Sequence, residues 1–189
     1  FQGVIDWDKV KAAGITLAII RGGYGRVSDK QFKLNWQMAK GKVKRAMYYY
    51  IDWYSNHKAG TAVFGMPDEE WGREQARFAW SLEKHDPEGM IFPDTENTNA
   101  ADTTLEKVPE RVQTIVKAFL IEIDRLNGLF NGMYHSLALC SWFGAWFRNR
   151  PLWVAWYEKS VTIDHVRELV KKKGWTGPLI LWQFASDGI

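Results

Sequence analysis

The chain has 189 residues, of which 46% are hydrophobic, so it is long enough to bury one core and nothing in it requires a second domain. The net charge is +3 and the basic residues are dispersed, which argues against a nucleic-acid-binding protein. No apolar run approaches the ~18 residues that span a bilayer, so membrane insertion is not expected. We expect a single domain over residues 1–189 that works as a monomer.

Aromatic residues are in excess, with 11 Trp, 7 Tyr and 10 Phe. Flat rings pack on the apolar faces of sugars, and their polar atoms can bond hydroxyl groups, so this composition suits a carbohydrate cleft as well as a core. The single cysteine, Cys140, cannot form an internal disulfide and is expected to pack in the core.

Short apolar strands alternate with longer amphipathic segments, a pattern that predicts a parallel sheet with crossover helices. In the first half of the chain, the pattern predicts a helix at 6–13, a strand at 16–21, a glycine loop at 22–25, a helix at 29–40 capped by Asp29, a strand at 45–51 and a helix at 69–84. In the second half, it predicts strands at 91–96, 133–136, 152–157 and 179–184, and helices at 104–126, 137–147 and 164–173. The predicted fold is a single irregular TIM-like (β/α) barrel with parallel strands and fewer than eight helices.

The predicted strand at 91–96 carries an apolar run directly into Asp94 and Glu96. Side chains two apart on a strand point to the same face, about two rises of ~3.3 Å from each other. Two acids at this spacing do not titrate alike, because the charge on one raises the pKa of the other. One acid that donates a proton beside one that stays ionised is the pairing that glycoside cleavage requires.

In barrels of this type, the active site lies at the carboxyl ends of the strands. The residues at or just beyond the predicted strand ends are Tyr50, Asp52, Asp94, Glu96, Tyr134, Trp156, Tyr157, Gln183 and Asp187. Asp52 and Asp187 are interpreted as solvated outer acids.

Several segments together resemble the glycoside hydrolase family 25 lysozymes, the muramidases of bacteria, fungi and bacteriophage lysins. The similar segments are FQGVIDW at 1–7, KVKAAG at 9–14, LAIIR at 17–21, YYY at 48–50, PDTE at 93–96, YHS at 134–136, LWVA at 152–155 and LWQF at 181–184. The family also has an aspartate that would precede Phe1 and an acid that would follow the final strand. Two interpretations stay open: the ends are cut from a longer chain, or the protein lacks these acids and is catalytically weak.

The resemblance implies hydrolysis of the β-1,4 bond between N-acetylmuramic acid and N-acetylglucosamine in peptidoglycan. Glu96 would be the general acid, and Asp94 would stabilise positive charge or orient the N-acetyl group. Two strand rises exceed the ~5 Å that suits a direct carboxylate nucleophile, which favours substrate assistance with retention over water-mediated inversion. The alternatives are a catalytically weak wall-binding module of the same fold and a glycosidase that acts on another amino-sugar polymer, such as chitin.

Five aromatic residues are candidate sugar contacts, namely Tyr50, Tyr134, Trp153, Tyr157 and Trp182. Trp153 and Tyr157 share one face of their strand, while Trp156 lies on the other, so only one of the two sets can line the barrel mouth. Arg21 and Gln183 could bond the substrate or satisfy neighbouring groups.

No metal ligand set is expected, because the four histidines, His57, His85, His135 and His165, have no ligand spacing and do not cluster with cysteine. The Gly22–Gly25 run lacks phosphate-loop and dinucleotide patterns, so no cofactor is expected either. The expected partner is the glycan strand of the wall, with the protein secreted or released by a phage.

Overall fold

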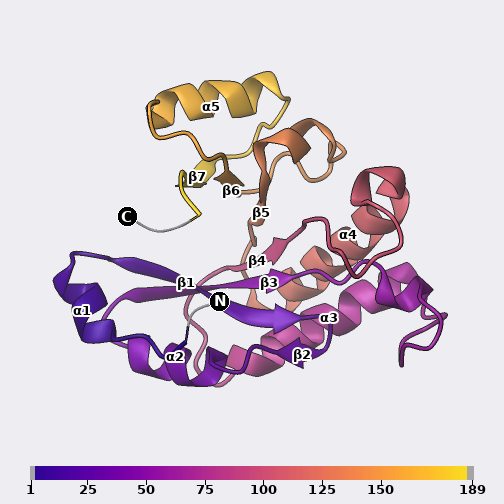
Figure 1. Ribbon diagram of the computed structural model, residues 1–189, viewed down its shortest axis with the longest axis horizontal. Coiled ribbons are helices and arrows are strands. Elements are labelled where there is room, and N and C mark those ends of the chain that lie inside the picture. The colour runs from indigo at the N-terminus through magenta and orange to yellow at the C-terminus, as the bar shows by residue number, and fades with distance from the viewer. Residues whose placement is uncertain (1–2, 187–189) are drawn as a thin grey trace.

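The computed structural model describes residues 3–186, and Figure 1 traces its single chain through a curved sheet with helices outside it. The sheet has seven strands in the order β2-β1-β3-β4-β5-β6-β7. The strands are β1 Leu17–Tyr24, β2 Val27–Ser28, β3 Lys44–Tyr50, β4 Ile91–Asp94, β5 Met133–Ser136, β6 Leu152–Ala155 and β7 Leu179–Gln183. All neighbouring pairs are parallel except β1 with β2.

Five α-helices accompany the described strands: α1 Trp7–Ala12, α2 Phe32–Ala39, α3 Asp68–Glu83, α4 Pro109–Asn127 and α5 Ile163–Lys172. Short 3-10 helices occur at η1 Ser55–His57, η2 Leu105–Lys107 and η3 Leu137–Ser141. Pro109 begins α4, where its missing N–H costs nothing, and Gly128 ends it in the left-handed conformation at φ 70°. None of the helices in residues 3–186 is long and apolar enough to cross a membrane.

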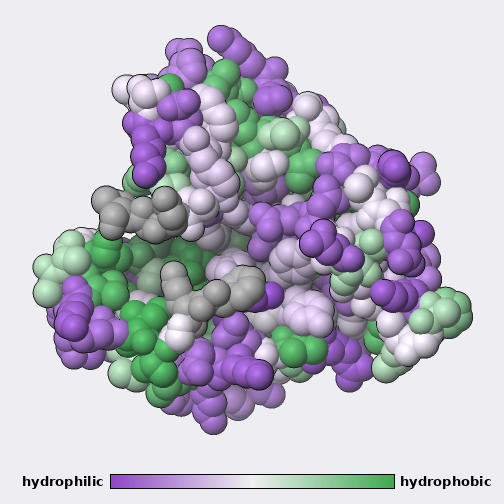
Figure 2. All heavy atoms as spheres, viewed as in Figure 1, coloured by the Kyte–Doolittle hydropathy of each residue, from purple (hydrophilic) through white to green (hydrophobic). Residues whose placement is uncertain are grey.

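The sheet turns as it passes from β1 and β3 to β5, β6 and β7, so the described strands form an irregular, incomplete α/β barrel (Figure 1). The main core lies between the sheet and the helices and includes Met47, Ile91 and Phe119, each fully buried. A smaller apolar cluster, which includes Phe92 and Tyr134, packs on the inner face of the sheet. Figure 2 shows the molecule hollowed between its N-terminal half and its C-terminal part.

The predicted barrel of parallel strands is thus confirmed, and three local predictions are wrong. The glycine loop at 22–25 is largely strand, because β1 continues to Tyr24 and pairs with the unpredicted β2. A Cβ on Gly23 would lie 2.1 Å from Val27 O, so the strands could not approach this closely with a larger residue there.

The expected aromatic-rich helix at 137–147 is only a short 3-10 helix followed by turns. Asp29 does not cap α2, because its carboxylate accepts the N–H of Gln31 in a turn before the helix. Cys140 is buried, as expected.

Candidate active site

The strand β4 delivers two acids to the carboxyl end of the sheet. It lies between β3 and β5, and all four of its residues are buried. Ile51 N donates to Asp94 O at 2.9 Å, which anchors the last residue of β4 to the chain after β3. Asp94 and Glu96 line the same cleft, Asp94 at 5% exposure and Glu96 as an exposed residue. The cleft has a volume of about 690 Å³, a size that suits an oligosaccharide segment.

Both carboxyl groups of this pair have raised pKa values. Burial is the main cause for Asp94, whose pKa lies well above its ordinary value, and the negative charge of Glu96 raises it further while Arg21 lowers it. The pKa of Glu96 is raised by partial burial of its carboxyl group, and a hydrogen bond from Tyr134 lowers it. The two groups titrate as a pair. At a pH between full protonation and full ionisation of the pair, they share a single proton.

The deeper acid also lacks a hydrogen bond to one of its oxygens. Asp94 Oδ1 is buried and has no partner among residues 3–186. A buried acceptor without a donor is costly, so this oxygen is suited to accept a hydrogen bond from a bound molecule.

The wall of the cleft beside the acids is aromatic. The rings of Trp153 and Tyr134 lie 4.3 Å apart between centroids, and Tyr48 meets Trp153 edge-on at 6.1 Å. Tyr134 donates its hydroxyl hydrogen to Gln183 Oε1 at 2.9 Å. Tyr157, beyond the end of β6, is 57% exposed and leaves a ring free to pack on a ligand.

The remaining cleft residues on the N-terminal side are Tyr50 and Arg21. Tyr50 donates its hydroxyl to the backbone oxygens of Glu96 and Asn97, both at 3.3 Å, and its pKa is raised by burial and by the charge of Asp94. Arg21 lines this cleft and also a neighbouring pocket.

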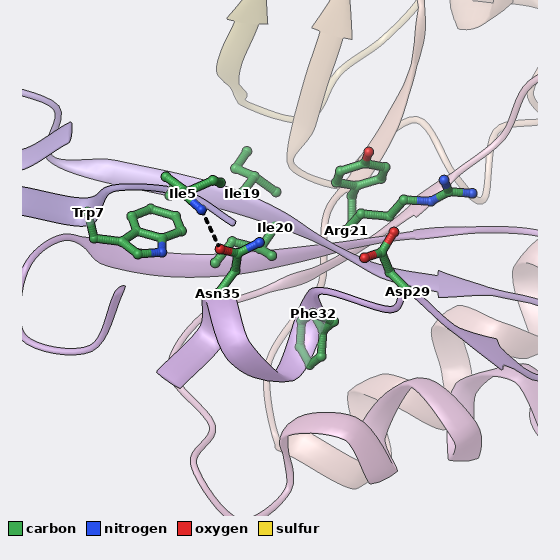
Figure 3. Close-up of a pocket in the computed structure, with 10 residues that line it drawn as sticks. Ile5, Trp7, Ile19, Ile20, Arg21, Asp29, Phe32 and Asn35 are labelled. Atoms are coloured by element: carbon green, nitrogen blue, oxygen red, sulfur yellow. Dashed lines mark hydrogen bonds between the residues drawn. The ribbon is translucent and has the colours of Figure 1, made fainter. Parts of the chain in front are cut away.

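That neighbouring pocket, about 210 Å³ in volume, is shown in Figure 3. Its amide side chain serves the fold: Asn35 accepts the N–H of Ile5 at 3.2 Å and donates to Gly3 O at 3.1 Å, which fixes the segment before α1 against α2. We therefore place the candidate site in the larger cleft.

The predicted site residues were the two acids, five aromatic sugar contacts, Arg21 and Gln183. All of them line one cleft except Trp182, for which the prediction is wrong. Leu181 and Gln183 face the inside of the barrel, so Trp182 between them points outward, where it packs on the main core and donates to Trp156 O at 2.8 Å. Trp156 also lies on that outer face, stacked 6.1 Å from His165, so the Trp153 and Tyr157 set is the one at the barrel mouth.

The interpretation of Asp52 as a solvated acid is also wrong. Asp52 is 4% exposed, and its carboxylate accepts the backbone N–H groups of Tyr54 and Ser55 in a turn. Asp187 lies outside the described residues.

Sequence reasoning missed six residues that line the cleft: Tyr24, Tyr48, Tyr54, Thr98, Ala100 and Ser186. Tyr48 could have been found from alternation, because it lies two residues before Tyr50 on the same strand. Tyr24 was hidden by the mistaken loop, and Thr98 and Ala100 belong to an irregular segment whose path no periodicity reveals. No group of three or more His, Cys, Asp or Glu side chains suited to a metal ion occurs within residues 3–186.

The family model described as glycosyl hydrolases family 25 matches residues 1–189. The chain belongs to glycosyl hydrolases family 25. A comparison with curated protein sequences finds no match.

Solved structures similar to this family 25 chain come from several sources. The modular autolysin LytC from Streptococcus pneumoniae, in complex with a synthetic peptidoglycan ligand, is 17% identical with a TM-score of 0.68, over 96% of this chain and 39% of that one. The bacterial lysozyme from Streptomyces coelicolor is 19% identical with a TM-score of 0.63, over 100% of this chain and 81% of that one. The CTP1L endolysin is 16% identical with a TM-score of 0.71, over 99% of this chain and 57% of that one.

At these identities the neighbours show that this family 25 chain shares their fold. It spans well under half of LytC and little more than half of the endolysin. The resemblance found in the sequence is confirmed by the match of the family model over the whole chain.

Proposed function

We propose that this chain is a lysozyme that cleaves the β-1,4 bond between N-acetylmuramic acid and N-acetylglucosamine in peptidoglycan. The observation that carries the proposal is the pair of carboxyl groups with raised pKa values, Asp94 and Glu96, in one cleft walled by tyrosine and tryptophan rings. Membership of a family of glycoside hydrolases supports the reaction class. The cleft is built by one chain, so a monomer is sufficient for activity.

Glu96 acts as the general acid. It is the more exposed of the two acids, so its carboxyl group can reach the oxygen between two sugars. The raised pKa of Glu96 keeps the carboxyl group protonated to higher pH than an ordinary glutamate. As the glycosidic bond breaks, Glu96 gives its proton to the departing oxygen and becomes a carboxylate.

Asp94 acts on the sugar that loses the leaving group. The sequence suggested that this acid simply stays ionised, whereas burial raises its pKa strongly, so the free enzyme favours its neutral form. The N–H of a 2-acetamido group that donates to Oδ1 would supply the missing partner and favour the carboxylate. The proton that the pair shares would then lie on Glu96, and ionised Asp94 would hold the acetamido group while the carbonyl oxygen of that group attacks the anomeric carbon.

The resulting oxazolinium ion is opened by water, which gives a proton to the Glu96 carboxylate, and the product keeps its anomeric configuration. Inversion by a water molecule is the second route. Proton NMR of the first product from a defined oligosaccharide distinguishes them, because an inverted anomer excludes the oxazolinium route.

The function is tested by lysis of purified bacterial walls with native protein and the Glu96→Gln variant. We expect native protein to clear the suspension and release reducing muramic acid ends, while the variant binds walls, unfolds at a similar temperature and lacks lysis. Binding without lysis by the native protein would instead indicate a wall-binding module. Cleavage of chitin oligomers in place of walls would indicate a different amino-sugar substrate.

The proposed site of action is the cell wall, reached by secretion or by release from a phage-infected cell. The cationic balance of +3 favours approach to an anionic wall surface.

A further inference from the structure

The backbone that carries Glu96 lies beyond the regular sheet. β4 ends at Asp94, and the last ladder-like contact on the side of β5 is a long one, from Thr95 N to Tyr134 O at 3.4 Å. The carbonyl of Glu96 is instead held by a side chain, because the indole N–H of Trp53 donates to it at 3.0 Å. A tryptophan from the segment after β3 therefore takes over where strand pairing stops.

Trp53 is well suited to fix this position. Its side chain is 0% exposed, and its ring meets Tyr54 edge-on with centroids 5.9 Å apart. Packing of this kind leaves few rotamers available, so the direction of the N–H is set by the surroundings. Tyr50 is a second and longer donor to the same carbonyl, at 3.3 Å.

The segment that contains Trp53 is itself tied to a helix. Gln75, on α3 and 0% exposed, accepts the N–H of Asp52 at 2.8 Å and donates to Asp52 O at 3.0 Å. This two-point contact fixes the backbone next to Trp53. A continuous path of contacts thus leads from α3, through Asp52 and Trp53, to the peptide of Glu96.

The chain after Glu96 is fastened separately. Asn97 donates to both carboxylate oxygens of Glu106 at 3.2 Å and accepts the N–H of Leu105 at 2.8 Å. These bonds hold the far side of the turn and leave the Glu96 carbonyl to Trp53 and Tyr50.

We propose that Trp53 is a positioning residue, whose indole N–H fixes the Glu96 peptide so that the carboxyl group points into the cleft at the height of the glycosidic oxygen. This inference rests on the proposed function. Trp53 itself touches no substrate, since it is buried and is not among the residues that line the cleft. A displacement of about 1 Å at a reacting group can cost on the order of 100-fold in rate, so one buried bond at this point has a measurable effect.

The test compares Trp53→Phe with Trp175→Phe in the full chain. Trp175 is an equally buried tryptophan at 1% exposure whose indole N–H also donates to one carbonyl, Arg150 O, at 2.9 Å. Each variant therefore loses one hydrogen bond from an indole N–H to a backbone carbonyl, and only Trp53→Phe loses the bond to Glu96. We expect Trp53→Phe to lower kcat by about 10-fold to 100-fold with KM unchanged.

The second measurement is the pH dependence of kcat, and in particular its alkaline limb, the fall of kcat at alkaline pH. A carboxyl group that is no longer held in the cleft spends time in water, so its pKa falls and the limb moves to lower pH in Trp53→Phe. If Trp53 served only the stability of the fold, Trp53→Phe would have a lower melting temperature than native protein, and its alkaline limb would stay at the same pH. If Trp53→Phe does not fold, replacement of Trp53 by 3-benzothienylalanine keeps the bicyclic ring and removes only the N–H.

The outcomes separate this inference from the proposed function. Activity in Glu96→Gln overturns the assignment of the proton donor and this inference with it. Loss of activity in Glu96→Gln, with a Trp53 variant that matches Trp175→Phe in kcat and in its pH profile, overturns the positioning role alone.

Discussion

The hydroxyl of Tyr134 on β5 donates to Gln183 Oε1 on β7 at 2.9 Å, across the intervening strand β6. The same hydroxyl lies beside Glu96 and lowers its pKa through a hydrogen bond. A hydroxyl has only one proton to donate, so Gln183, Glu96 and the hydroxyl of Tyr157 compete for it. Gln183 thereby helps to keep the pKa of the proposed general acid high.

This competition predicts opposite effects for two substitutions. Tyr134→Phe removes the donor, so the pKa of Glu96 rises and the alkaline limb of kcat moves to higher pH. Gln183→Met removes one competitor, so the hydroxyl donates more often to Glu96, whose pKa falls, and the limb moves to lower pH. Each variant loses one neutral hydrogen bond, with a cost in stability of about 1 kcal/mol. Shifts in the same direction for both would contradict the competition.

Tyr157→Ala is predicted to weaken substrate binding without loss of stability. The ring is 57% exposed at the cleft, so the native fold loses little packing, whereas a sugar loses a flat apolar partner. We expect KM for wall oligosaccharides to rise about 10-fold, equivalent to ~1.4 kcal/mol of binding free energy, with kcat little changed.

Phe64→Ala is the matched control for Tyr157→Ala. Phe64 is a similarly exposed aromatic residue, at 60%, and is not among the residues that line the cleft. An equal rise of KM in both variants would show that the effect of Tyr157 does not come from contact with the sugar.

Much of this site could be predicted from the sequence, because most of its residues lie on or just after strands that are recognisable in the sequence. Asp94 ends β4, whose apolar run is easy to recognise, and Glu96 follows two residues later. Tyr134 lies on the neighbouring strand β5, and parallel strands bring their carboxyl ends together. The face of Trp182 could not be assigned, because β7 carries apolar residues on both of its faces, Leu181 on the inner one and Trp182 on the outer one. The buried state of Asp52 and the bond from Trp53 to Glu96 depend on irregular segments, in which no period fixes the direction of a side chain.

Asp94→Asn is predicted to stabilise the fold and to slow catalysis strongly. The folded state raises the pKa of Asp94 above its unfolded value, so folding takes up a proton and the stability of native protein falls as pH rises through the folded pKa. Asparagine has no charge to bury. The variant should therefore have a higher melting temperature than native protein at pH 7, and the difference should be smaller at pH 4.

The same variant should lose about 100-fold or more in kcat, because the neutral amide cannot stabilise an oxazolinium ion. Thermal unfolding at both pH values and lysis assays check the two effects together. A variant that is less stable than native protein at pH 7 would contradict the burial penalty assigned to Asp94.

Glu83, the last residue of α3, is a second buried acid whose raised pKa should make stability depend on pH, and it lies outside the cleft. It is 2% exposed, both of its carboxylate oxygens lack partners among the described residues, and burial raises its pKa to about 8. The positive charge of Arg45 opposes this rise, whereas the charges of Asp86 and Glu88 add to it. Because the unfolded chain releases this proton near pH 4.5 and the folded chain near pH 8, Glu83 makes native protein less stable as pH rises between these values.

Glu83→Gln removes the titration and keeps the shape of the side chain. We expect this variant to be more stable than native protein by on the order of a few kcal/mol at pH 8, and to show no such gain at pH 4, since the native carboxyl group is then neutral in both states. Glu69→Gln, at an exposed position of the same helix, controls for charge removal and should keep the pH dependence of native protein. Lytic activity should be unchanged in both variants, because neither residue lines the cleft. Urea unfolding at pH 4, 6 and 8 measures the effect, and a stability gain for Glu83→Gln that is equal at all three pH values would place its cause in packing and not in ionisation.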